Sequence, residues 1–88
     1  MIDNYTPLAQ QVAGWSLQRE RQGACLVYSG GHFLACNTSR YSAIENAIKG
    51  AIGKEDLYCN YTPSPKDCEL ILKSGITKVI VNGVEVEI

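Results

Sequence analysis

Apolar residues recur along this chain at two different spacings, and the change of spacing divides it into helices and strands. Leu8, Val12 and Trp15 lie at helical spacing, and Thr6-Pro7 before them offers a cap followed by a first-turn proline. The pattern therefore predicts a first helix over residues 6–19 that packs one apolar stripe against the rest of the protein.

Three shorter apolar runs have the length and composition of strands. Residues 24–29 and 32–36 flank Gly30-Gly31, and glycine tolerates the positive backbone angles of a tight hairpin turn. Residues 57–60 form the third run. We expect the first two runs to pair as an antiparallel hairpin.

A second helix is predicted from Ser42 to about Ile52, with Gly53 as its stop. Ser42-x-x-Glu45 has the spacing of a capping box, which gives Ser42 a structural role and disfavours a serine nucleophile. The apolar residues that we expect on its packed face are Ala43, Ile44, Ala47, Ile48, Ala51 and Ile52.

The stretch from Tyr61 to Val81 marks every boundary of a strand-helix-strand unit. Ser64 can cap a helix, with a proline in its first turn and Asp67 completing a capping-box pair. Ser74-Gly75 ends the helix with a residue that tolerates a left-handed conformation, and a β-branched strand follows.

The last residues form a second hairpin. Asn82-Gly83 is a strong signal for a two-residue turn, and residues 84–88 alternate strictly between apolar residues and glutamates. We expect residues 1–88 to be one α/β domain that ends in an antiparallel hairpin, whose outward glutamates discourage uncontrolled edge pairing.

Composition and charge narrow the classes of function. The 88 residues are 45% hydrophobic and 19% charged with a net charge of −1, and no run of lysine or arginine is present, so nucleic acid and anionic membranes are poor partners. No apolar run has the length of a membrane span. Four unevenly spaced cysteines inside helix and strand patterns indicate reduced thiols, so we expect a cytoplasmic protein of the producing or host cell.

These patterns resemble the cytidine and deoxycytidylate deaminase superfamily over Leu8–Val81. The family's second zinc segment reads Thr-x-Ser-Pro-Cys-x-x-Cys, then a helix, then Ser/Ala-Gly-Ile-x-x-Val-Val/Ile. The matching residues here are Thr62, Ser64, Pro65, Cys68, Ser74, Gly75, Ile76, Val79 and Ile80. In the front half the matches are Leu8, Ala9, Val12, Ala13, Ser16, Gly23, Ala24, Leu34 and Ala35. The resemblance implies a three-layer α/β/α cytidine-deaminase-like fold on a mixed five-stranded sheet.

The resemblance fails at the residues that carry the family's chemistry. The family's helix signature His-Ala-Glu-x-Asn-Ala-Ile aligns with residues 42–48, so Ser42 replaces the zinc-binding histidine and Ile44 replaces the proton-shuttling glutamate. Lys66 stands at the first zinc cysteine, and Cys68 corresponds to the second only if one position is deleted. A zinc site needs at least three protein ligands, so the resemblance implies a pseudo-deaminase with no metal, no cofactor and no catalytic residues.

The region that corresponds to the family's substrate cleft is the best candidate for a retained binding site. The family's long substrate loop is cut here to residues 37–41, which removes much of what would close over a nucleotide. The candidate ligand-binding residues of this remnant cleft are Asn37, Ser39, Ser42, Tyr61, Thr62 and Ser64. For His32 we favour an exposed turn residue over a metal ligand, and for Lys66 and Glu69 a pair on the solvent face over a catalytic role.

Three functions are compatible with the sequence. The first is a non-catalytic protein that acts by protein-protein interaction, as a small inhibitor or regulator of viral or mobile-element origin, and the short chain favours it. The second is a nucleotide-binding sensor or sequestering protein, against which the shortened loop counts. The third is an enzyme with an unrecognised mechanism, and the absence of a nucleophile-base pair in the sequence counts against it most.

We also expect a homo-oligomer. The right-handed crossover rule places the helices that start at Ser42 and Pro65 on one face of the sheet, which leaves only the first helix for the other face. Part of an apolar sheet face would then be bare, and such surfaces are normally buried by association.

Overall fold

The structure, a computed structural model, describes residues 3–88. Its elements follow one another as α1 (Thr6–Ala13), β1 (Gly23–Tyr28), β2 (Gly31–Cys36), α2 (Ala43–Gly50), β3 (Asp56–Cys59), α3 (Pro65–Ser74), β4 (Lys78–Val81) and β5 (Val84–Val86). None of these helices is both long and apolar enough to cross a membrane.

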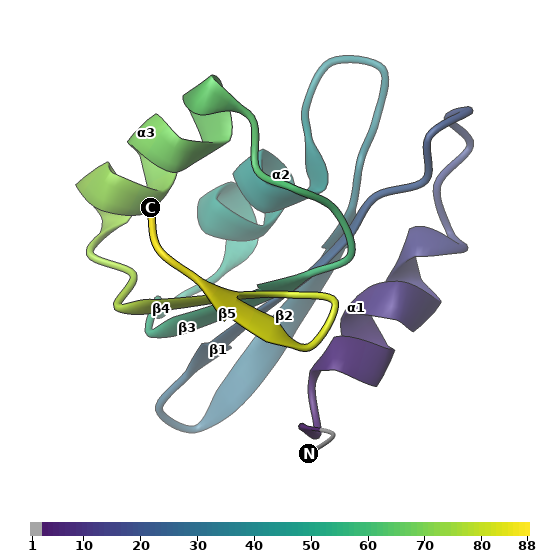
Figure 1. Cartoon of the computed structure of the whole chain (residues 1–88). Coiled ribbons are helices and arrows are strands. Elements are labelled where there is room, and N and C mark those ends of the chain that lie inside the picture. Colours follow the sequence, from purple (N-terminus) through teal and green to yellow (C-terminus); the bar gives the residue numbers. More distant parts are fainter. Residues whose placement is uncertain (1–2) are drawn as a thin grey trace.

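The strands form one mixed sheet in the order β2-β1-β3-β4-β5, in which β3 and β4 are parallel and the other neighbours are antiparallel (Figure 1). Helices α2 and α3 lie on one face, and α1 lies on the other. The predicted α/β class, the mixed five-stranded sheet, the final hairpin and the deaminase-like layer arrangement are therefore confirmed.

The main core lies between the sheet and the pair α2 and α3. Leu26 and Leu57 project from the central strands, Ile44 comes from α2 and Ile71 from α3, and all four are fully or almost fully buried. Apolar side chains of this size contribute about 1.5–3 kcal/mol each when they are fully buried. This cluster therefore fixes how the starts of α2 and α3 lie relative to the sheet.

Helix α1 is shorter than the sequence pattern predicts. It ends at Ala13, and Trp15, which we expected on its packed stripe, is 62% exposed. The buried Ser16 causes the turn, because its hydroxyl donates to the carbonyl of Asn37 at 3.2 Å and accepts from the amide of Gln18 at 3.1 Å. These bonds fold the chain away from the helix axis.

The start of α1 is capped by a residue that the pattern did not indicate. Thr6 is inside the helix, and its amide and hydroxyl both donate to the carboxylate of Asp3, at 2.5 and 2.6 Å. The amide of Tyr5 donates to the same carboxylate at 2.9 Å. Burial alone would raise the pKa of Asp3, but these hydrogen bonds hold that pKa below its usual value.

Helix α1 packs closely on the first strand. A Cβ atom at Gly23 would lie 1.9 Å from the carbonyl oxygen of Ala9, so only glycine permits this approach. Helix α2 ends at Gly50, two residues before the predicted end, which leaves Ile52 exposed and not on the packed face.

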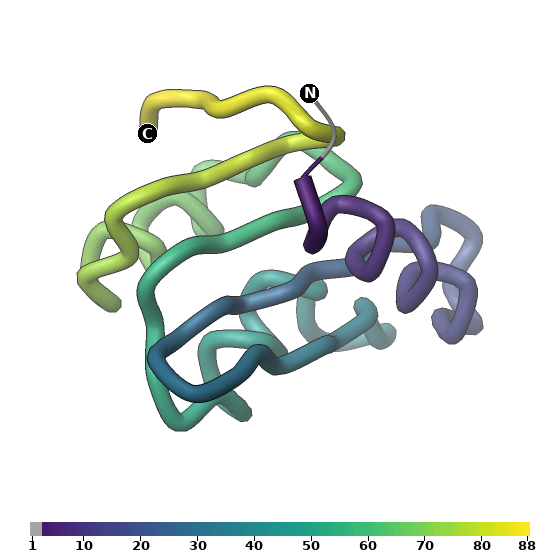
Figure 2. The backbone as a smooth tube through the Cα atoms, turned by 90° about the horizontal axis from the view of Figure 1, so that it is seen from below, coloured from purple at the N-terminus to yellow at the C-terminus, as the bar shows by residue number. Residues whose placement is uncertain are grey.

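The face that carries α1 differs from the bare apolar surface on which we based the expected oligomer. Helix α1 packs on β1, β2 and β3, and the strands β4 and β5 extend beyond it (Figure 2). There the sheet exposes Lys78 and Glu85 on either side of the almost fully buried Ile80. On the face that carries α1, the exposed positions of these two strands are therefore charged, and the homo-oligomer stays a prediction.

Candidate functional site

The starts of α2 and α3 meet at a buried carboxylate. Asp67 lies in the first turn of α3 and is 1% exposed. The hydroxyl of Ser42, the N-cap residue of α2, donates to its Oδ1 atom at 2.5 Å, and the phenol of Tyr61 donates to its Oδ2 atom at 3.0 Å. One carboxylate therefore joins two helix starts and the segment between β3 and α3.

Backbone amides complete this arrangement. The amide of Ser64 donates to Asp67 Oδ2 and the amide of Asp67 donates to Ser64 Oγ, both at 3.2 Å, so the predicted capping box of α3 is confirmed. The amide of Glu45 donates to Ser42 Oγ at 3.1 Å, and that of Ile44 donates to the phenol oxygen of Tyr61 at 3.2 Å. The Asp67 carboxylate thus lies at the N-termini of two helices. The positive end of a helix dipole stabilises an anion there.

Tyr61 serves this network as a hydrogen-bond donor. Burial raises its pKa well above the usual range, and the nearby charge of Asp67 acts in the same direction. Among residues 3–88, every buried side-chain nitrogen and oxygen has a hydrogen-bond partner. Each hydroxyl and carboxylate oxygen of the Ser42–Tyr61–Asp67 network is therefore paired within the protein, and in this sense the network is closed.

The lysines around the network pair differently from our expectation. Lys66 binds the carboxylate of Glu45 at 3.3 Å, and Glu69 binds Lys73 at 3.0 Å, so the expected Lys66–Glu69 pair is wrong. Lys49 also contacts Glu45, at 3.5 Å. Since the Glu45 carboxylate binds these two lysines, only the Ser42 half of the predicted α2 capping box is formed.

The residues that the resemblance aligns with zinc ligands are engaged in other contacts and do not fit a zinc ion. The hydroxyl of Ser42 is donated to Asp67, and the ammonium group of Lys66 is bound to Glu45. The thiol of Cys68 lies 4.0 Å from the carbonyl oxygen of Pro63. Over the part of the chain that the structure describes, no group of three or more His, Cys, Asp or Glu side chains is placed to hold a metal.

The structure gathers three of the six predicted ligand-binding residues. Ser42, Tyr61 and Ser64 all contact Asp67. Thr62 is exposed on the segment between Tyr61 and Ser64. Sequence reasoning assigned Asp67 only a local capping role, because nothing local indicates that its other oxygen reaches a residue 25 positions earlier.

The other two predicted residues lie on the far side of Ser42. Asn37 is structural, because its amide group accepts from the backbone of Gln22 at 3.1 Å and donates to the backbone of Glu20 at 2.8 Å. Ser39 is exposed. Both residues border a shallow polar depression of about 230 Å³. Its lining residues are Gln22, Asn37, Thr38, Ser39, Arg40, Tyr41 and Ser42.

The histidine and the cysteines occupy structural positions. His32 is exposed, as expected, but it lies in β2, paired with Val27, and not in the turn. Its ring packs edge-on against Tyr5, with ring centroids 5.8 Å apart. Cys25 and Cys59 are fully buried in the sheet, and burial raises the pKa of each thiol to about 11. Cys36 and Cys68 are half-buried.

The fold defined by these elements is the deaminase fold, a mixed sheet with two helix starts meeting over its centre. A solved structure with the same fold is the apo dCMP deaminase from the cyanophage S-TIM5, with a TM-score of 0.73 and 22% sequence identity over 85% of this chain and 76% of that chain. No protein-family model matches the sequence. The search of curated proteins likewise gives no match.

The network changes what is expected of substitutions at Ser42. A cap alone would make Ser42→Asp nearly neutral, because aspartate also caps helices. In the structure, however, a second carboxylate would face Asp67 at hydrogen-bonding distance, and like charges there repel. We expect Ser42→Ala to cost about 1–3 kcal/mol of unfolding free energy and Ser42→Asp at least as much at pH 7.

Urea unfolding at pH 7 and pH 4 measures this difference. Protonation of one carboxylate at the lower pH relieves the repulsion, so Ser42→Asp should recover stability relative to Ser42→Ala. A Ser42→Asp protein as stable as the parent at pH 7 would show that Ser42 acts only as a cap.

Proposed function

We propose that the protein is a non-catalytic deaminase-fold protein that acts by binding another protein, as a small inhibitor or regulator. The observation that carries the proposal is the closed network around Asp67. It occupies the place where, by the resemblance, the zinc site of a deaminase lies, and its hydroxyls and amides are bonded to one another. A site of this kind stabilises the helix starts and has no free group with which to activate water.

The position that corresponds to the catalytic glutamate supports the same proposal. Ile44 is fully buried and packs in the main core with Leu26 and Leu57. The neighbouring Glu45 cannot take over the role of a free carboxylate, because Lys49 and Lys66 both bind it. Proton transfer during deamination needs a carboxylate that faces the substrate.

A binding role is supported by large apolar side chains at the surface. Trp15 and Leu17 are exposed directly after α1, and Leu72, Val84 and Ile88 are exposed around α3 and the last hairpin. Tryptophan in particular is enriched among the residues that dominate protein-protein binding. An inhibitor or regulator carried by a virus or other mobile element fits the cyanophage origin of the structural neighbour.

The zinc content and activity of the purified protein test the non-catalytic part. We expect less than about 0.1 zinc per chain by elemental analysis, because a structural or catalytic site needs three or four suitable ligands. We also expect no conversion of cytidine, deoxycytidine or their monophosphates to uridine products. Stoichiometric zinc together with deamination that depends on the protein would overturn the proposal.

Nucleotide binding is the second candidate function, and the polar depression next to Ser42 favours it. Ser39 and Arg40 are exposed around this depression, where a hydroxyl and a guanidinium suit a sugar and a phosphate. Affinity capture from the native host with mass spectrometry separates the two functions. A stoichiometric protein partner supports the first, and a co-purifying nucleotide supports the second.

A further inference from the structure

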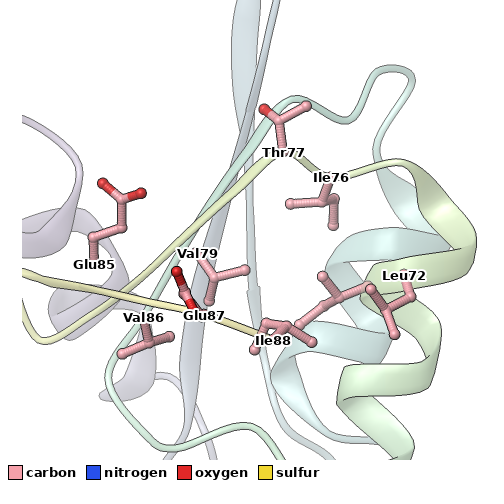
Figure 3. Close-up of a pocket in the computed structure, with 9 residues that line it drawn as sticks. Leu72, Ile76, Thr77, Val79, Glu85, Val86, Glu87 and Ile88 are labelled. Carbon is pink, nitrogen blue, oxygen red and sulfur yellow. The ribbon is translucent and has the colours of Figure 1, made fainter.

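A groove of about 400 Å³ runs between α3 and the β4–β5 hairpin (Figure 3). Nine residues line it from both sides. Six are apolar, namely Ile71, Leu72, Ile76, Val79, Val86 and Ile88, and the other three are Thr77, Glu85 and Glu87. Leu72 is 68% exposed and Ile88 is 42% exposed, so the groove opens to solvent along its length.

Strand β5 borders this groove and is one of the two edges of the sheet. The other edge, β2, has helices packed on both faces, α1 on one and α2 on the other. At β5 the apolar positions of the strand face the α3 side, since Val84 and Val86 are paired with Val81 and Val79 of the core. Val84 is nevertheless 64% exposed.

The backbone of β5 is arranged to pair with another strand. Asn82 and Gly83 both have positive φ, 50° and 87°, as in the two-residue turn that favours a hairpin. In such a turn the amide of Val84 bonds back to Val81, and the bonded pairs then alternate along the ladder. The amide and carbonyl of Glu85 therefore point away from β4, towards the open edge.

The charges at this edge are predominantly acidic. Glu85 projects from the face opposite the groove's apolar side chains, because side chains alternate along a strand and Glu85 is paired with Ile80. Glu87 follows β5 directly and borders the groove. Around Glu85 the same face carries Asp3 and Lys78, which line a second hollow with it. Three carboxylates and one ammonium group leave a net negative surface beside the edge.

From this geometry, and on the basis of the protein-binding function proposed above, we propose that β5 binds an extended segment of another protein as a sixth strand of the sheet. The segment has apolar residues at alternate positions, which fill the groove beside Leu72 and Val86. Its intervening residues are basic and meet Glu85 and the neighbouring Glu87. Main-chain hydrogen bonds supply affinity in this mode of binding, and the alternating side chains supply specificity.

A second copy of this chain fits the edge less well. Residues directly opposite each other in a pair of antiparallel strands point to the same face, so valines would meet valines and glutamates would meet glutamates. Like charges directly opposite each other are destabilising. The charge pattern of β5 therefore favours a basic partner over self-pairing.

Three nine-residue peptides with blocked ends test the proposal on the whole protein. The first alternates lysine and valine, the second alternates glutamate and valine, and the third has the composition of the first with its lysines grouped together. We expect the first peptide to bind at least about tenfold more tightly than the others at low salt. Against the second peptide, two opposite-charge pairs replace two like-charge pairs. The third peptide has the same charge as the first but lacks the alternation that puts valines on one face and lysines on the other. Amide chemical shifts and hydrogen exchange should change at residues 84–88 and along the exposed side of α3.

Two substitutions at one position separate charge from backbone pairing. Glu85→Gln keeps the outward amide and should weaken binding of the lysine peptide about threefold by loss of one charge pair. Glu85→Pro also removes the amide and should weaken binding further, while it leaves the bonds of Val84 and Val86 to β4 in place. Glu20→Gln, in the exposed loop after α1, is the control and should leave binding unchanged.

Equal affinity for the lysine and glutamate peptides, or chemical shift changes away from β5 and α3, would overturn the assignment of this edge. So would protection of the β5 amides by self-association of the protein alone, detected by sedimentation equilibrium. These results are independent of the zinc and deamination assays. A protein that is inactive and shows no peptide preference would contradict only the β5 site, whereas an active deaminase would contradict the proposed function.

Discussion

Replacement of Asp67 by alanine should destabilise the protein by about 3–5 kcal/mol, a large part of the stability of a domain of this size. The carboxylate is almost fully buried and accepts hydrogen bonds from Ser42, Tyr61 and Ser64. Alanine would leave these three donors without their acceptor and would remove the side chain that connects α2 with α3. Each buried polar group left unpaired costs about 1–3 kcal/mol.

Urea unfolding followed by circular dichroism measures this loss. Asp67→Asn keeps the shape and one acceptor oxygen, so its loss should be intermediate. Glu69→Ala is the matched control on the same helix, because the Glu69 carboxylate is exposed and pairs only with Lys73 at the surface, which is worth about 0–1 kcal/mol. A loss below about 1 kcal/mol for Asp67→Ala would mean that the network contributes little.

Ile44→Glu, which introduces a glutamate where the resemblance places the proton shuttle of deaminases, should unfold the protein or cost at least about 4 kcal/mol. Ile44 is fully buried between the sheet and the pair α2 and α3, and a carboxylate there would have apolar neighbours such as Leu26 and Leu57. The substitution also removes the packing of a large core side chain. A position that still faced an open substrate cleft would instead accept the glutamate readily.

Thermal and urea unfolding compare Ile44→Glu with Ile44→Val, which removes one methylene group and should cost only about 0.5–1.5 kcal/mol. A folded Ile44→Glu protein with near-parental stability would contradict the buried position of this residue. It would also reopen the question of catalysis, so zinc content and deamination should then be measured on the same variant.

Much of the fold was predictable because its signals are local. The cap and capping box of α3, its left-handed end at Gly75 and the turn at Asn82-Gly83 lie where the sequence indicates. The alternation of residues 84–88 predicted an edge strand with outward glutamates, although the regular part of β5 ends at Val86. The resemblance to deaminases then gave the order and layers of these elements.

The sequence was less informative where a distant contact overrides a local pattern. Helical spacing continues through Trp15, but the bond between Ser16 and Asn37, 21 residues apart, turns the chain and ends α1 at Ala13. The expected pair Lys66–Glu69 follows local spacing too. Lys66 instead binds Glu45 on another helix, because the tertiary fold brings that carboxylate closer.

The sequence by itself therefore determined the order of helices and strands and their caps and turns, since each depends on residue identity and near neighbours. That the zinc ligands and glutamate of deaminases are replaced here stays a prediction from the resemblance. Only the tertiary structure decided which residues meet at the starts of α2 and α3. Ser42 and Asp67 lie 25 residues apart, and their contact exists because both crossover connections place their helices on the same face of the sheet. Burial between those helices then makes a fully bonded carboxylate the stable arrangement.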